Sequence, residues 1–147
     1  TTFSFVVDGF LRSSSHIPVG SSGITKELAE SLGLDMQIAN FLKKDFGLVN
    51  LYQLPKPVQD GLSILKSELS TFVELNKKIS QIPDKIVFTG GGVYIAVLMS
   101  FFKSFPIPCY LANSTRSVVI QDEYKPYIFP IINELSTSIG LAIKDDV

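Results

Sequence analysis

The sequence has few of the side chains that hold metals or form disulfides. Its 147 residues include one histidine, His16, one cysteine, Cys109, and no tryptophan. A structural zinc ion needs four nitrogen or sulfur ligands, so we expect no such metal site. A single cysteine cannot close a disulfide within the chain, which favours a reducing compartment such as the cytoplasm. His16 has no nucleophile or carboxylate close by in the sequence, so we expect a surface histidine on a strand rather than a general base.

Charge of either sign and long apolar runs are also scarce. The 13 basic and 14 acidic residues give a formal net charge of −1. A surface that binds nucleic acid needs clustered lysine and arginine, so we expect no nucleic-acid partner. No apolar run reaches the roughly 18–20 residues of a membrane span. Hydrophobic residues make up 46% of the sequence, which is typical of one ordinary globular domain with its own core.

An apolar run that ends in three glycines is the most informative stretch. Ile86-Val87-Phe88 has the apolar, β-branched and aromatic character of a buried parallel strand. Thr89 and Gly90-Gly91-Gly92 follow it, and we predict a helix over residues 93–105. Glycine lets the backbone lie directly against a ligand, and open α/β sheets bind ligands at the carboxyl ends of their strands. This glycine corner is therefore a candidate binding site; the alternative is a tight turn without a ligand.

The remaining pattern predicts an α/β domain with a leading β-hairpin, a mixed sheet and flanking helices. We expect strands over 2–7, 10–19 and 107–111, helices over 26–32, 36–46, 57–80 and 131–144, and a short strand or extended loop over 117–121. Ser22 or Thr25 is expected to cap the helix over 26–32, and Gly33 to end it. Gly140 suggests close packing of the last helix.

The helix over 36–46 carries a finer expectation. Ile38, Leu42 and Phe46 recur at a spacing of four, which predicts that they form the buried face. Lys43 and Lys44 fall outside this stripe and are expected on a solvated face unless they bind a ligand.

Five segments match motifs that occur, in this order, in one family. They cover residues 1–9, 16–29, 38–47, 88–92 and 134–142, and they include Ile17-Pro18-Val19-Gly20, Phe88-Thr89-Gly90-Gly91-Gly92 and Ile139-Gly140-Leu141-Ala142. In these segments the chain resembles the actin-like ATPases, most closely the PilM family of type IV pilus assembly, with the FtsA family of cell division as the near relative. The resemblance implies that residues 1–147 form one domain. This domain corresponds to the second large subdomain of the ribonuclease H-like ATPase fold, with a helical insertion at about 23–80.

The resemblance also implies an adenosine site. In this family the glycine corner, here Gly90–Gly92, lies beside the purine and the ribose, and Thr1 and Thr2 follow the second phosphate loop. A glutamate and a lysine three residues apart on a helix clamp the ribose and the base. The corresponding residues here are Asn40 and Lys43, so a neutral amide replaces the carboxylate. The implied ligands of the longer protein are ATP and Mg²⁺.

The resemblance limits the chemistry of this chain. The sequence begins inside a predicted strand and lacks most of the phosphate and Mg²⁺ machinery of the family, so we expect a piece of a longer chain. We therefore assign no catalytic residue and expect no ATP hydrolysis by residues 1–147 alone. Asp35, Asp45, Asp60 and Asp84 have the contexts of caps or surface residues, which argues against a sugar kinase of the same fold.

The role implied is that of a cytoplasmic scaffold for type IV pilus assembly, held at the inner face of the membrane through its partners. ATP would close the cleft and so control the recruitment of the cytoplasmic tail of a PilN-like inner-membrane protein, or self-association. Two alternatives remain open at this point. One is an FtsA-like cell-division protein, and the other is a protein-binding module of the same fold that binds no nucleotide.

Overall fold

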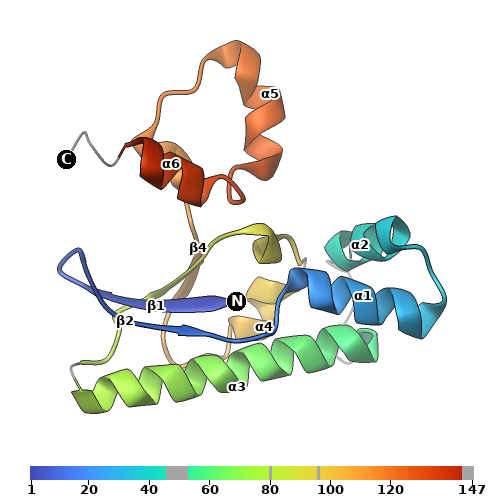
Figure 1. Ribbon diagram of the computed structural model, residues 1–147, viewed down its shortest axis with the longest axis horizontal. Helices are drawn as coiled ribbons and strands as arrows, with labels where there is room; N and C mark the ends of the chain where they lie inside the picture. Colours follow the sequence, from blue (N-terminus) through green and yellow to red (C-terminus); the bar gives the residue numbers. More distant parts are fainter. Residues whose placement is uncertain (46–52, 80, 96, 144–147) are drawn as a thin grey trace.

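The computed structural model describes residues 1–45, 53–79, 81–95 and 97–143. Figure 1 shows a body that holds the strands and the long helix, and a C-terminal segment, residues 112–143, that rises above it. In the described residues β1 (Thr2–Val7) pairs antiparallel with β2 (Phe10–His16), and β3 (Ile86–Phe88) pairs parallel with β4 (Cys109–Leu111). The α/β class with a leading hairpin is confirmed, whereas the strands predicted to form one mixed sheet form two separate pairs in the described residues. Among the described residues no helix has both the length and the apolar character needed to cross a membrane.

The β-hairpin follows the prediction in its first strand and shortens the second. The turn Asp8–Gly9 takes φ angles of 51° and 81°, which aspartate and glycine tolerate better than other residues. Phe3 and Phe5 of β1 are buried, while Ser4 between them is exposed. Beyond β2, Thr1 and Ile17 exchange two backbone hydrogen bonds of 2.9 Å. The Thr1 amino group also donates to the Val19 carbonyl at 2.7 Å, which holds the chain beyond Pro18 against the start of β1.

The long helix α3 (Lys56–Ile79) lies beneath the hairpin and supplies much of the core (Figure 1). The helix predicted over 57–80 is confirmed, and Val58, Leu62, Leu69 and Val73 are buried along one side of it. Gly61 of α3 has a packing role that the sequence did not suggest. A Cβ atom there would lie 2.6 Å from the Ile24 side chain. Glycine therefore permits the close approach of the helix that carries Ile24.

That helix, α1 (Ser21–Leu32), starts five residues earlier than predicted. Gly20 precedes its first turn, and the expected caps Ser22 and Thr25 lie inside the helix. The Thr25 hydroxyl donates instead to the Ser21 carbonyl, 3.0 Å away. The predicted end is confirmed, because Gly33 takes the left-handed conformation at φ 62°.

The next helix, α2 (Met36–Asp45), buries a different face from the predicted one. Ala39 is 0% and Lys43 2% exposed, whereas Ile38 is 51% exposed. Leu42 is half-buried, and Phe46 lies outside the described residues. The small side chain of Ala39 permits close packing of α2, and the Lys43 amine reaches hydrogen-bond acceptors on α1. The expectation of a solvated Lys43 is therefore wrong.

The glycine corner leads into a broken helix rather than the continuous one predicted over 93–105. A 3₁₀ turn, η3 (Gly91–Tyr94), comes first, and the α-helix α4 covers only Leu98–Phe102. Val93, Val97 and Phe102 are all buried. Because core contacts surround this run, its apolar residues do not repeat at the spacing of one helix face, and the sequence pattern does not specify a continuous helix. The Phe102 ring packs 4.9 Å from that of Phe88 in β3.

The C-terminal segment also departs from its prediction. It contains η4 (Ser114–Ser117), η5 (Asp122–Tyr124), α5 (Lys125–Ile128), η6 (Phe129–Ile131) and α6 (Ser136–Ala142). The helix predicted over 131–144 is thus reduced to α6, and residue 144 lies outside the described residues. Residues 118–121 form an extended loop, one of the two expected forms. Pro130 lies inside η6, where its ring disfavours a continuous α-helix. The close packing expected at Gly140 is wrong, because a Cβ atom there would meet nothing within 4 Å.

Candidate functional site

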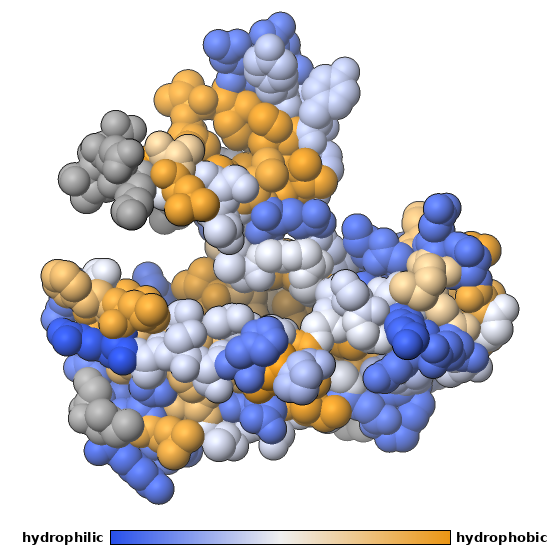
Figure 2. Space-filling model, in the orientation of Figure 1, coloured by the Kyte–Doolittle hydropathy of each residue, from blue (hydrophilic) through white to orange (hydrophobic). Residues whose placement is uncertain are grey.

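A cavity of about 840 Å³ lies between the hairpin and β3. It extends along β1 and β3 and reaches the glycine corner, where residues of the C-terminal segment also line it. Figure 2 shows the hollow that separates the C-terminal segment from the hairpin side of the body. The volume is that of a pocket for a small molecule of cofactor size.

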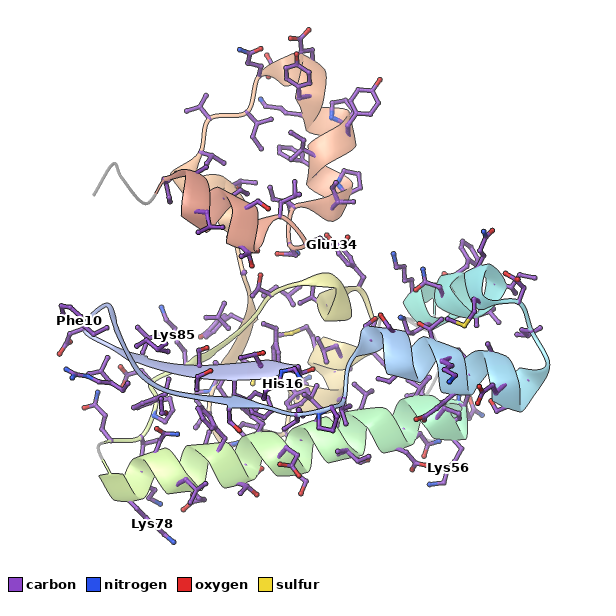
Figure 3. All side chains as sticks on the ribbon, in the orientation of Figure 1. Phe10, His16, Lys56, Lys78, Lys85 and Glu134 are labelled. Carbon is purple, nitrogen blue, oxygen red and sulfur yellow. The ribbon has the colours of Figure 1, made fainter. Side chains whose placement is uncertain are left out.

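The glycine corner is held by the C-terminal segment. Gly90 has φ 87°, which only glycine adopts readily, and its N–H donates to the Asn133 carbonyl at 2.9 Å. The N–H groups of Gly91 and Gly92 open η3 and so precede its first internal hydrogen bond. A Cβ atom on Gly91 would lie 3.7 Å from the Glu134 carboxylate. The corner thus offers backbone donors beside one carboxylate (Figure 3).

Lys43 is buried next to this corner, but its amino group is already occupied. Nζ donates to the Ser21 carbonyl at 2.9 Å, to the Ser21 hydroxyl at 2.6 Å and to the Thr25 hydroxyl at 2.5 Å. Burial, and secondly the charge of Lys44, lowers the pKa of the Lys43 amine. None of the ion pairs formed by the described residues includes Lys43. The ammonium group is therefore stabilised only by hydrogen bonds to uncharged oxygen atoms at the start of α1.

Lys43 connects to the cavity through Ser21. The Ser21 side chain lines the cavity and lies 4.0 Å from the position of a Cβ atom on Gly92. The lysine is therefore on the same side as the glycine corner, one side chain behind it. Lys44 lies over the Tyr94 ring of η3, with Nζ 5.4 Å from the centroid, and this contact also places α2 beside η3.

The other predicted site residues divide into two groups. Thr1 and Thr2 line the cavity together with Gly90 and Gly92. The Thr1 hydroxyl donates to the Val19 carbonyl at 2.6 Å, and the Thr2 hydroxyl lies 3.1 Å from His16 Nδ1. Asn40 is exposed on α2 and does not line the cavity. The assignment of these residues to a nucleotide stays a prediction.

His16 lies where the sequence suggested, exposed on β2. Its one hydrogen bond in the described structure is to the Thr2 hydroxyl. The described residues contain no group of three histidine, cysteine, aspartate or glutamate side chains that could hold a metal ion.

Sequence reasoning missed three polar groups at the cavity. Glu134 lines it and faces Gly91. Ser136 also lines it and lies 2.5 Å from the Thr89 hydroxyl. The buried Asn133 Oδ1 has no hydrogen-bond partner among the described residues. Nothing in the sequence near residues 133–136 indicates that they meet the corner, because the contact joins segments more than forty positions apart.

Comparisons with known proteins identify the fold. No protein-family model matches the chain, and no curated protein does. Among solved structures, one match is to a chain of the “PilM-PilN type IV pilus biogenesis complex”, with a TM-score of 0.79 and 18% sequence identity. The two chains share a fold. The match covers 97% of this chain and 42% of the other, so the PilM-like fold described here spans about two fifths of that chain.

Proposed function

We propose that this chain is the nucleotide-facing half of a PilM-like scaffold for type IV pilus assembly. The observation that carries the proposal is the fold shared over 97% of the chain with a chain of the PilM–PilN complex. The whole protein binds ATP with Mg²⁺, closes around it and thereby recruits the cytoplasmic tail of a PilN-like inner-membrane protein. The half described here supplies the adenosine end of the cleft, and the rest of the protein supplies the phosphate and metal contacts.

The geometry of the corner supports this division. Backbone N–H groups at Gly91 and Gly92 suit acceptor atoms of a base or sugar, and the Glu134 carboxylate suits hydroxyl or amino donors. The Ser21 hydroxyl, fixed by Lys43, adds one more polar group at the same end of the cavity.

Deletion of the gene in its source organism tests the function. The expected result is loss of surface pili in electron micrographs, with cell length and division unchanged. Filamentous cells with normal pili would contradict the proposal and favour the FtsA-like alternative. Complementation with the whole gene carrying Gly92→Val should restore fewer pili than Gly140→Val, because only the first fills the cavity.

One observation favours a nucleotide-free binding module as the second candidate. The Lys43 amine, expected to clamp a ligand, is used inside the fold by Ser21 and Thr25. Thermal melting of the whole protein with and without ATP–Mg²⁺ separates the two candidates. Ligand at 100 times its dissociation constant should stabilise the nucleotide-binding form by about 2.7 kcal/mol. An unchanged melting temperature at millimolar ATP would favour the module.

A further inference from the structure

A serine hydroxyl and a buried lysine amine lie side by side at the edge of the cavity. Ser21 is the first residue of α1, lines the cavity and is only partly buried. Lys43 comes from α2, which packs beside α1 (Figure 1), and its Nζ lies 2.6 Å from Ser21 Oγ. A hydroxyl within hydrogen-bond reach of an amine is the arrangement of a nucleophile with its own general base. The proposed nucleotide site uses this hydroxyl only as a polar contact.

A third group holds the amine in place. Thr25 Oγ1 accepts a hydrogen bond from Lys43 Nζ at 2.5 Å, and the Ser21 carbonyl accepts another at 2.9 Å. The Thr25 hydroxyl is itself fixed, because it donates to the same carbonyl. A neutral amine keeps two N–H groups for these two acceptors, and its lone pair is then directed at the Ser21 hydroxyl. The three partners of Nζ therefore suit the neutral amine as well as the ammonium form.

The surroundings of Lys43 favour loss of its proton. The side chain is 2% exposed, and burial and the charge of Lys44 lower the pKa of the amine. Buried lysines with a lowered pKa are the ones that act as general bases. The other titratable groups on the elements around it are Lys26, Glu27 and Glu30 of α1, Tyr94 of η3 and Glu134 beyond the glycine corner. The three on α1 are exposed, so water screens their charges.

Backbone N–H groups flank the Ser21 hydroxyl. Those of Ser22 and Gly23 precede the first internal hydrogen bond of α1, which the Ile24 N–H donates at 3.1 Å. The glycine corner lies on the other side, because a Cβ atom on Gly92 would lie 4.0 Å from the Ser21 side chain. Preorganised N–H groups of this kind stabilise the negative charge that develops on a carbonyl oxygen under attack.

We propose that Ser21 is a nucleophile toward carboxylic esters with an uncharged, apolar acyl group, with Lys43 as its general base and Thr25 as a positioning residue. Ser21 Oγ bonds to the carbonyl carbon and gives its proton to Lys43 Nζ. The bond to the alcohol oxygen then breaks, and that oxygen takes the proton from Nζ. Water releases the acyl group from Ser21 as a carboxylic acid by the same two steps.

The cavity suits such a substrate. Ile24 and Val93 line it and follow Ser21 and the glycine corner closely in the sequence, so apolar surface lies near the hydroxyl. The Glu134 carboxylate at the corner disfavours an anionic acyl group. This inference goes beyond the proposed function and does not depend on it, because a scaffold that binds nucleotide needs no acyl transfer.

Hydrolysis of p-nitrophenyl acetate by the purified protein tests the proposal, with the acetyl group located by peptide mass spectrometry after an acid quench. Ser21→Ala removes the nucleophile. Ser31→Ala is the matched control, since it removes a hydroxyl of the same helix that bonds the Leu28 carbonyl. Lys43→Met removes the base, and Lys43→Arg keeps a positive charge but cannot give up its proton. Thr25→Val removes the positioning hydroxyl at nearly constant volume.

The expected acetyl group is on Ser21. Ser21→Ala and both Lys43 variants lower the rate by about a hundredfold or more, and Ser31→Ala leaves it unchanged. The rate of the natural protein rises with pH, because the neutral amine is the base, and it levels off below the ordinary lysine pKa of about 10.4. Thr25→Val lowers the rate and shifts the pH at which it levels off, which a loss of stability alone would not do.

Three results would overturn the proposal. They are an acetyl group found only on other residues, equal rates for Ser21→Ala and Ser31→Ala, and a Lys43→Arg variant as active as the natural protein. Circular dichroism checks that each variant is folded. If the Lys43 variants do not fold, the comparison of Ser21→Ala with Ser31→Ala and the site of acetylation still decide, because each of these serine variants loses a single hydroxyl.

Discussion

Lys43 is a buried cation held by neutral acceptors. Its side chain is 2% exposed, and its amine bonds Ser21 and Thr25 at the start of α1. Burial disfavours the charged form and lowers the pKa of the amine below its ordinary value of about 10.4. The lysine therefore joins α2 to α1 at the cost of desolvating one charge.

This burial predicts a pH dependence of stability. Between the lowered folded-state pKa and about 10.4 the unfolded chain binds more protons at this residue than the folded chain, so stability rises with pH there. The free energy of unfolding of the natural chain minus that of Lys43→Met should therefore increase from neutral toward pH 10. The slope is at most about 1.4 kcal/mol per pH unit.

Urea unfolding at pH 7, 8.5 and 9.5 measures this difference. Lys26→Met on α1 is the matched control, since it removes a lysine whose side chain is 70% exposed. A difference that stays constant or falls as the pH rises would contradict the prediction for Lys43.

At this scale the sequence predicted some positions and not others. His16 on a strand surface and Gly33 at a helix end follow from local chemistry, and both are confirmed. The burial of Lys43 could not be predicted, because the partner that makes it favourable is the first turn of another helix. Apolar periodicity pointed to Ile38, yet Ala39 and Lys43 form the buried pair.

Helices α1 and α3 cross at a point where only glycine fits. A Cβ atom on Gly61 would lie within 2.6–2.7 Å of two atoms of Ile24. Helix propensity alone favours alanine over glycine by about 1 kcal/mol. Steric overlap with a buried side chain costs more than this when the helices cannot move apart, typically about 1–3 kcal/mol.

Gly61→Ala should therefore lower the free energy of unfolding by up to about 2 kcal/mol. Gly140→Ala in α6 is the matched control, since a Cβ atom there meets nothing within 4 Å and alanine should stabilise that helix slightly. Chemical denaturation measures both. Ile24→Val combined with Gly61→Ala should recover part of the loss, and a stabilised Gly61→Ala variant would show that the helices do not approach this closely.

An element could be predicted from the sequence when only one of its faces is buried. The hairpin and α3 were predicted because a turn signal and a long one-sided stripe specify them locally. The run after the glycines was predicted as one helix, yet it folds as η3 and α4. A segment that is apolar throughout is compatible with several backbone conformations, so its pattern did not distinguish them. The last predicted helix, over 131–144, is helical only over Ser136–Ala142, because residues 131–135 form the end of η6 and a turn.

At the scale of the whole molecule, a small polar cluster attaches the C-terminal segment to the body. The Asn133 carbonyl accepts from the Gly90 N–H and the Ser136 hydroxyl, and it lies 3.3 Å from the Thr89 hydroxyl. Ser136 Oγ lies 2.8 Å from that of Ser114. Much of the segment's apolar surface is exposed, including Tyr127 and Leu141, so these hydrogen bonds carry a large share of the attachment.

Ser136→Ala should loosen this attachment. The hydroxyl links Thr89, Ser114 and Asn133, and its loss removes hydrogen bonds worth about 0.5–1.5 kcal/mol each. Limited proteolysis should cleave residues 118–135 several times faster, while hydrogen exchange in α3 stays unchanged. Ser70→Ala on the exposed face of α3 removes one hydroxyl that bonds only its own helix, and it serves as the control. Equal cleavage of both variants would show that the cluster does not hold the segment.

The class of fold and the position of the corner could be predicted from the sequence, but the surroundings of the corner could not. Ile86–Gly92 forms a strand and a glycine corner that local composition specifies. The contact of Glu134 with Gly91 joins residues far apart in the chain, and no local pattern encodes such a contact. The same holds for the cavity between β1 and β3, which exists only once both pairs of strands have formed.

The carboxylate of Glu134 beside Gly91 gives the corner a chemical preference. An anion brought to the N–H groups of η3 would meet this negative charge at short range, so like charges repel there. Uncharged groups that carry their own hydrogen atoms gain from both the amides and the carboxylate. A ligand bound at the corner would therefore place a sugar or an amino-substituted ring there rather than a phosphoryl group, and an elongated ligand would lie with its charged end pointing away.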